Sequence, residues 1–305
     1  MSIDLLQSKI RKLKAPIVVG LDPTPELIPP ELLAQCRDQL GDSVEALAEG
    51  YLRFCKGILD ALKKLVPAVK VQAACFDALG WQGVKVMQEL LAYAKKQGYY
   101  VLLETMRTDV GHIAAISAES VFGGIPCGEE RVFPYPCDGL VLNGYLGSDG
   151  IKPYLPFVKE DGKNLFVVVK SSNKSSCEVQ DLLSGDRVIY TAMADLTLRW
   201  STDLFGKCGY GEVGAVVGLG SPTAIQALRK RYDSLFFLVP GYGAQGGVAK
   251  HAAYAFDRLG HGAAVCASRS ILGAWREQAG VDYPDAAVAA VEKMKKQLEA
   301  YVTVL

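Results

Sequence analysis

Residues 165–172 have the sequence LFVVVKSS, an apolar and β-branched run that ends in polar residues. A run without alternation is typical of a strand in a parallel sheet that is covered on both faces, because a half-exposed strand alternates apolar and polar residues. Similar runs recur along the chain. We therefore predict buried strands in these ranges: 17–22, 68–74, 100–106, 138–143, 165–172, 212–218, 235–241 and 263–270.

Segments with helical spacing separate these runs. Residues 43–65 and 83–98 have apolar side chains at intervals of three and four, and residues 222–232 begin with a proline, which a first helical turn tolerates. A strand followed by a helix-sized segment, repeated around the chain, predicts the α/β class and a single (β/α)8 TIM barrel. We expect one barrel domain over residues 1–305, with the Gly- and Pro-rich stretch 122–137 as a surface excursion rather than a domain boundary.

The composition argues against several classes of protein. The chain has 33 basic and 33 acidic residues, so its charge gives no reason to expect binding to nucleic acid or to an anionic membrane. The eight cysteines include no CxxC pair, which favours buried free thiols and no metal site. Residues 1–14 suit an amphipathic helix and lack the apolar core of a signal peptide, and no apolar run is long enough to span a membrane. We expect a cytoplasmic protein.

Polar residues gather at the ends of the predicted strands. Barrel active sites form at the carboxyl-terminal ends of the strands, whereas a barrel needed only for stability could have apolar ends there. The residues at these ends are Asp22, Lys70, Gln72, Glu104, Asn143, Ser171, Ser172, Asn173, Gly241 and Arg269. The sequence therefore predicts a functional site at this end of the barrel.

Two loops at these ends suggest what the site binds. Residues 239–247, VPGYGAQGG, can turn backbone N–H groups toward an anion, and Arg269 after the last strand could complete a phosphate site. The alternative is a glycine-rich turn kept for tight packing beside a surface arginine. Ser172 and Asn173 could bind a ring amide, and the alternative for them is a helix N-cap.

Six motifs together resemble the bacterial long-form orotidine 5'-phosphate decarboxylases. They are VVGLDP, VKVQAACFDALG, LNGYLGSDGIKPYL, KSSN, VPGYGAQGG and SRSIL, in order between about residue 15 and residue 275. The resemblance implies a (β/α)8 barrel, a homodimer and no cofactor. It also implies conversion of orotidine 5'-phosphate to uridine 5'-phosphate and CO2, in pyrimidine nucleotide biosynthesis.

The resemblance assigns roles by position. It implies that Asp22 contacts the ribose and that Lys70 belongs to the charged network beside the reacting carbon. The pyrimidine would meet Ser172 and Asn173. The residues implied for the 5'-phosphate are Gln245, the backbone of Gly246 and Gly247, and Arg269.

The third predicted strand departs from the family. Members resemble one another there in an Asp-x-Lys-x-x-Asp motif, whose second Asp reaches the partner subunit's site. Here Glu104 stands at the first Asp, Met106 at the Lys and Asp109 at the second Asp. Because side chains alternate along a strand, we expect Glu104 and Met106 to face the pocket and Arg107 to face the helices.

The loss of this lysine changes the expected function. In the family the lysine stabilises the carbanion left by CO2 and then protonates it, and a positioned general acid contributes about 10²–10⁴-fold. Met106 has no proton to give and suits a packing role. We expect binding of a 5'-phosphorylated pyrimidine nucleotide with weak or absent decarboxylation. The alternatives are a fully active decarboxylase with another proton donor, and an enzyme repurposed for another phosphorylated substrate.

Overall fold

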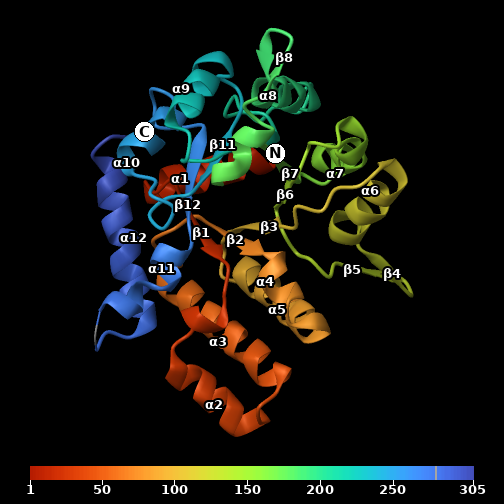
Figure 1. Cartoon of the computed structure of the whole chain (residues 1–305). Coiled ribbons are helices and arrows are strands. Elements are labelled where there is room, and N and C mark those ends of the chain that lie inside the picture. The colour runs from red at the N-terminus through yellow and green to blue at the C-terminus, as the bar shows by residue number, and fades with distance from the viewer. Residues whose placement is uncertain (279) are drawn as a thin grey trace.

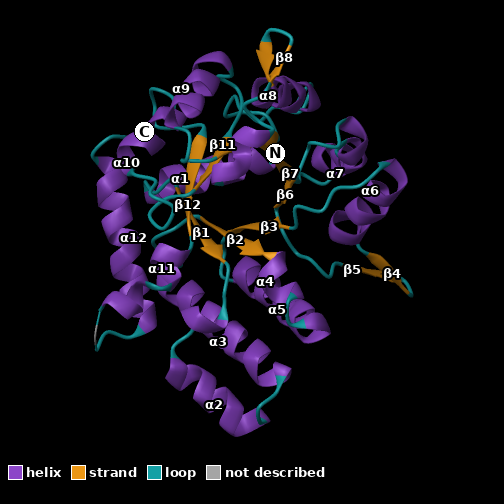
Figure 2. Ribbon diagram, in the orientation of Figure 1, coloured by secondary structure: helices purple, strands orange, loops and turns teal. Residues whose placement is uncertain are grey.

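A closed barrel of parallel strands forms the centre of the molecule (Figures 1 and 2). The computed structural model describes residues 1–278 and 280–305. The strands pair around the ring in the order β1-β12-β11-β10-β7-β6-β3-β2. They are β1 (Ile17–Leu21), β2 (Ala68–Gln72), β3 (Tyr100–Glu104), β6 (Gly139–Leu142), β7 (Asn164–Lys170), β10 (Val213–Val217), β11 (Phe237–Pro240) and β12 (Ala263–Ala267). Each begins and ends in a predicted run or within one residue of it, so the prediction of a (β/α)8 barrel is confirmed.

The barrel strands are buried on both faces. Every residue of β1, β3, β7, β10 and β12 is buried, including the charged ones. Burying one large aliphatic side chain stabilises the fold by roughly 1.5–3 kcal/mol. Strands with apolar residues on both sides are therefore stabilised most when one side packs in the filled barrel interior and the other packs against an outer layer of helices.

Helices surround the barrel (Figure 2). The α-helices are α1 (Ser2–Leu13), α2 (Pro30–Leu40), α3 (Val44–Leu62), α4 (Ala73–Asp77), α5 (Gly80–Lys96), α6 (Gly111–Ala118), α7 (Leu155–Glu160), α8 (Ile189–Trp200), α9 (Pro222–Arg231), α10 (Ala249–Ala252), α11 (Arg269–Leu272) and α12 (Tyr283–Glu299). Short 3-10 segments include η5 (Lys174–Glu178). The long helix α12 packs against α3 and α11 (Figure 1).

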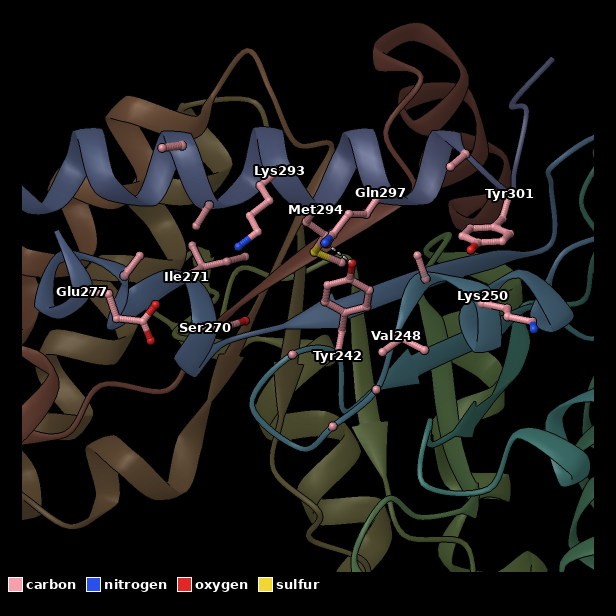
Figure 3. Close-up of a pocket in the computed structure, with 18 of the residues that line it drawn as sticks. Tyr242, Val248, Lys250, Ser270, Ile271, Glu277, Lys293, Met294, Gln297 and Tyr301 are labelled. Carbon is pink, nitrogen blue, oxygen red and sulfur yellow. Dashed lines mark hydrogen bonds between the residues drawn. The ribbon is translucent and has the colours of Figure 1, made fainter.

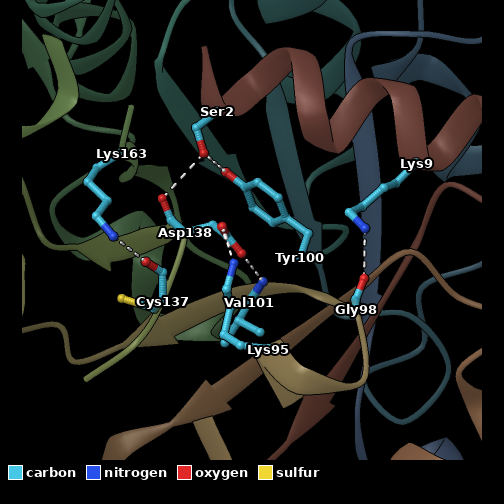
Figure 4. Close-up of polar contacts among 9 residues, drawn as sticks. All are labelled: Ser2, Lys9, Lys95, Gly98, Tyr100, Val101, Cys137, Asp138 and Lys163. Atoms are coloured by element: carbon cyan, nitrogen blue, oxygen red, sulfur yellow. Dashed lines mark hydrogen bonds and ion pairs between the residues drawn. The ribbon is translucent and has the colours of Figure 1, made fainter. Parts of the chain in front are cut away.

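Helix α1 closes the amino-terminal end of the barrel. The Oγ of Ser2 lies 2.8 Å from the hydroxyl of Tyr100, at the start of β3. Asp138, just before β6, accepts from the N–H of Val101 at 2.8 Å and pairs with Lys95 at 2.6 Å (Figure 4). The apolar face of α1 is fully buried and consists of Ile3, Leu6 and Ile10. The predicted amphipathic helix at the N-terminus is thus confirmed. It covers the amino-terminal end of the barrel, opposite the carboxyl-terminal ends of the strands.

Two small hairpins project from the barrel. One pairs β4 (Ile125–Cys127) with β5 (Glu130–Val132) in the Gly- and Pro-rich stretch, and all six residues are exposed (Figure 1). The other pairs β8 (Leu183–Ser184) with β9 (Arg187–Val188), between β7 and α8. Within the described residues, no helix is both long and apolar enough to cross a membrane.

All eight cysteines are free thiols, as the spacing predicted. Four are buried, whereas Cys127 and Cys177 are exposed, so the expectation of burial was wrong for these two. Cys127 lies in the exposed hairpin and Cys177 in η5, where no core element covers them.

Candidate functional site

Charged side chains from three neighbouring strands meet at the carboxyl-terminal mouth of the barrel. Lys70 lies on β2, Glu104 ends β3 and Asp22 follows β1. The parallel register places Gly20 beside Lys70 and Gln72 beside Glu104. The Nζ of Lys70 forms an ion pair with Glu104 Oε2 and lies 3.9 Å from Asp22 Oδ1. Three residues distant in sequence thus form one charged cluster.

Lys70 is charged although it is only 6% exposed. Burial by itself lowers the pKa of this lysine, but the carboxylates of Asp22 and Glu104 outweigh that effect and raise its pKa above the ordinary value. A buried ammonium is stable only when charged partners replace its water. Lys70 therefore holds its proton firmly, which makes it a fixed positive charge rather than a ready proton donor.

A pocket of about 190 Å³ opens beside this cluster. Its lining includes six of the residues to which the resemblance assigns a role, namely Asp22, Lys70, Glu104, Ser172, Gln245 and Arg269. Two buried oxygens, Asp22 Oδ1 and Ser268 Oγ, have no hydrogen-bond partner among the described residues. Since buried polar atoms are nearly always paired, these two oxygens suit a hydroxyl group of a bound molecule. Ser268 was not among the residues expected in the site, although it begins the SRSIL motif and directly precedes Arg269.

The glycine-rich loop forms one wall of this pocket. Gly243 and Gly246 have φ values of 71° and 81°, which glycine adopts without strain. The N–H of Gly246 donates to Gly243 O at 2.7 Å, and the N–H of Gly247 donates to Gly241 O at 3.1 Å. These two donors, expected from the sequence to face an anion, are used inside the loop in this structure. Gln245 and Arg269 both line the pocket.

A larger cavity, of about 840 Å³, also borders this loop (Figure 3). Gly246 and Gly247 line it, together with residues of α12 such as Lys293 and Met294. The hydroxyl of Tyr242 donates to Gln297 Oε1 at 2.6 Å and so ties the loop to α12. The loop therefore borders both the charged pocket and this second cavity, and Tyr242 lines both.

Met106 lies outside the pocket, contrary to the expectation from strand alternation. β3 ends at Glu104, and Met106 has a φ of 51°, a left-handed conformation that breaks the pleat. Its side chain is 41% exposed and is absent from the lining of the charged pocket. The expectation that Met106 shares the face of Glu104 was therefore wrong.

The residues after Met106 also point away from the pocket. Arg107 forms an ion pair with Asp77 at the end of α4. Asp109 is exposed, and its carboxylate accepts from the N–H of Val110 at 2.7 Å. Of the three motif positions, the structure thus brings Glu104 to Lys70 in the pocket and leaves Met106 and Asp109 outside the pocket.

The segment after β7 completes the mouth. Ser172 lines the charged pocket, whereas Asn173 is exposed and lies just beyond the lining. A Cβ on Gly218, at the end of β10, would lie 2.6 Å from Ser172 Cα, so this position needs a glycine for the two strand ends to approach. Among the described residues, no group of three or more His, Cys, Asp or Glu side chains is placed to hold a metal ion.

Comparison with known proteins gives a consistent set of relatives. Residues 15–282 match the model of the Orotidine 5'-phosphate decarboxylase / HUMPS family. The chain is 37% identical over 287 residues to the orotidine 5'-phosphate decarboxylase of Rhodopirellula baltica, covering 92% of this chain and 93% of the relative. It is 31% identical over 300 residues to that of Caldicellulosiruptor bescii, covering 98% of both.

A solved structure shows the same similarity. The OMP decarboxylase of Leishmania donovani matches with a TM-score of 0.73 and 26% sequence identity, covering 98% of this chain and 99% of that chain. The residues that line the charged pocket all lie inside the region matched by the family model. The similarity therefore includes the pocket at the carboxyl-terminal end of the barrel as well as the strands and helices of the barrel.

Proposed function

Because the chain belongs to the Orotidine 5'-phosphate decarboxylase / HUMPS family, we propose that it binds a 5'-phosphorylated pyrimidine nucleotide and decarboxylates orotidine 5'-phosphate weakly or not at all. One observation carries the second half of the proposal. The residue at the position of the family's general acid is Met106, which has no ionisable group. Lys70 is the only lysine that lines the charged pocket in the described part of the chain.

The phosphate end of the pocket supports nucleotide binding. Arg269 and Gln245 both line it and lie on the loops that follow β12 and β11. An arginine can bind two phosphate oxygens at once. The N–H groups of Gly246 and Gly247 would join this site if the loop exchanged its internal hydrogen bonds for the anion. The orphaned oxygens of Asp22 and Ser268 suit the ribose hydroxyls.

The reacting end of the pocket supports the loss of catalysis. The four catalytic positions of the family are Lys70, Glu104, Met106 and Asp109 in this chain. Lys70 is bound to Glu104, so its charge is already neutralised. Removing the general acid alone costs about 10²–10⁴-fold. Losing a cation beside a developing negative charge costs on the order of 3 kcal/mol more, by analogy with oxyanion sites.

A homodimer in which Asp109 reaches the partner's site belongs to the same proposal. Asp109 lies outside the pocket of its own chain, at the start of α6. Large apolar side chains are exposed in the same part of the chain, because Val110, Ile116 and Leu146 are 56%, 63% and 59% exposed. Large exposed apolar side chains that cluster are typical of an interface. Replacing Ile116 with Asp should convert a dimer to a monomer in sedimentation analysis, and an unchanged mass would contradict this arrangement.

Purified protein tests the proposed function directly. Decarboxylation of orotidine 5'-phosphate is followed as a loss of absorbance, and binding of uridine 5'-phosphate is measured by calorimetry on the same sample. We expect binding with little or no turnover. Turnover at the rate of an ordinary enzyme would favour the alternative of a different proton donor. Absence of both would favour another phosphorylated substrate on the same barrel.

A further inference from the structure

A chain of hydrogen bonds links Gln180 to Asn173 through Ser171. The N–H of Ser171 donates to Gln180 Oε1 at 2.9 Å, and Gln180 Nε2 donates to Ser171 Oγ at 2.8 Å. The hydroxyl of Ser171 then donates to Asn173 Oδ1 at 2.6 Å. The side chain of Gln180 thus bonds both the backbone N–H and the hydroxyl of Ser171, nine residues earlier in the sequence.

The direction of every bond in this relay follows from one backbone group. The N–H of Ser171 can only donate, so the amide of Gln180 must present its oxygen to it. The Nε2 of Gln180 must then donate to the hydroxyl, which turns its own hydrogen toward Asn173. Asn173 accepts with Oδ1, and its Nδ2 is left without a partner among the described residues. The relay therefore leaves the Nδ2 of Asn173 available as a hydrogen-bond donor next to Ser172, just beyond the lining of the charged pocket.

A second set of contacts holds Gln180 in place. Lys170, the last residue of β7, is 2% exposed, and its Nζ bonds Ser176 Oγ at 3.0 Å and Asp181 Oδ1 at 2.8 Å. The N–H of Gln180 donates to Ser176 O at 2.8 Å, and its carbonyl accepts from the N–H of Tyr190 at 3.0 Å. The buried Lys170 thus anchors η5 through Ser176 and also Asp181, the residue after Gln180, which keeps Gln180 over the end of β7.

We propose that Gln180 is a positioning residue that, through Ser171, makes Asn173 select a nucleobase with a carbonyl oxygen rather than an amino group at the edge that faces it. This inference rests on the proposed nucleotide binding, because it places the pyrimidine beside Ser172 and Asn173. A fixed N–H donor stabilises a carbonyl acceptor. An amino group in the same place would leave two donors facing each other, with neither hydrogen bonded. The pocket should therefore prefer uracil-type bases to cytosine-type bases.

The variant Gln180→Glu reverses the relay without removing it. A carboxylate has two acceptor oxygens, so one takes the N–H of Ser171 and the other takes the hydrogen of its hydroxyl, in a charge-assisted bond. The hydroxyl can then only accept from Asn173, which turns its Nδ2 toward Ser171 and its Oδ1 toward the ligand. The preferred base edge should change from a carbonyl to an amino group.

Calorimetry with uridine 5'-phosphate and cytidine 5'-phosphate tests this inference. In the unsubstituted protein, we expect uridine 5'-phosphate to bind at least about tenfold more tightly. In Gln180→Glu the ratio should fall by about tenfold or invert. In Ser171→Ala, which removes the hydroxyl but keeps the backbone N–H, Asn173 can turn either way, and the ratio should approach one. The control Gln39→Glu makes the same chemical change on α2, where Gln39 bonds Arg53, and should keep the ratio.

The outcomes separate this inference from the proposed function. If Gln180→Glu and Ser171→Ala bind both nucleotides with the original ratio, the relay does not set specificity and the inference is wrong, while nucleotide binding stands. If the unsubstituted protein binds neither nucleotide, the proposed function fails and this inference fails with it. Should Gln180→Glu not fold, the ratio in Ser171→Ala decides, because that change leaves the clamp on the backbone intact.

Discussion

Glu212 should make the stability of this protein depend on pH near neutrality. The residue precedes β10 at the closed end of the barrel and is 0% exposed. Its carboxylate accepts from the N–H of Ile3 at 3.0 and 3.1 Å, at the start of α1. Burial raises the pKa of Glu212 from 4.5 to about 7, although the hydrogen bonds from Ile3 and Asn164 oppose the change. The folded protein therefore binds this proton more tightly than the unfolded chain does.

The sign and size of the effect follow from these two values. Between pH 4.5 and about 7 the folded state holds a proton that the unfolded state has lost, so the free energy of unfolding falls as the pH rises. One pKa unit corresponds to about 1.4 kcal/mol, which gives a total loss of roughly 3 kcal/mol. Below pH 4.5 the stabilisation is complete, and above about pH 7 it is gone.

The variant Glu212→Gln should remove this dependence. Glutamine keeps an acceptor for the N–H of Ile3, and it adds a donor beside Asn164, whose Oδ1 has no partner among the described residues. Urea unfolding at pH 5 and pH 8 measures the free energy of each protein. From pH 5 to pH 8 the free energy of unfolding of the unsubstituted protein should fall by roughly 3 kcal/mol more than that of the variant. If the two proteins differ in free energy of unfolding by the same amount at pH 5 and pH 8, the argument that Glu212 is protonated in the folded protein near neutral pH is refuted.

Three further predictions concern the charged pocket. Lys70→Met should lower the free energy of unfolding by about 3–5 kcal/mol in urea titrations, because it leaves Glu104 buried without its partner; a loss below about 1 kcal/mol would mean that water already solvates that carboxylate. Arg269→Ala should weaken binding of uridine 5'-phosphate by about 10- to 100-fold in calorimetry, since charge-assisted bonds contribute about 1.5–3 kcal/mol, while the affinity for uridine stays the same; an equal loss for uridine would place the arginine away from the phosphate. Met106→Lys combined with Glu104→Asp should raise the rate of decarboxylation by at least about 10²-fold over Glu104→Asp alone. No gain in rate would show that the loop after β3 cannot bring residue 106 to the substrate.

The larger part of the fold was predictable from the order of residues. Runs such as 165–172 are apolar on both faces, which is typical of a parallel sheet that is covered on both sides. These runs were therefore enough to predict the strand ranges and the barrel. The polar residues at the strand ends were equally visible, and Asp22, Lys70 and Glu104 do meet at one mouth. In a parallel barrel every strand ends on the same side, so local sequence was enough to group them.

The tertiary structure alone decided how these side chains are used. Strand periodicity extended β3 to Met106, but the strand ends at Glu104 and a left-handed turn carries Met106 to the rim, where strand periodicity no longer applies. No sequence pattern indicated a role for Gln180, because its role depends on a loop that folds back onto Ser171. The pKa of Glu212 likewise depends on the folded chain, because burial raises it and a hydrogen bond from Ile3, more than two hundred residues away in sequence, opposes the change. Local pattern determined where the apolar strands lie, because the alternation or continuity of apolar residues depends on near neighbours. Partners that are distant in sequence set charge, donor direction and access, and only the folded chain brings them together.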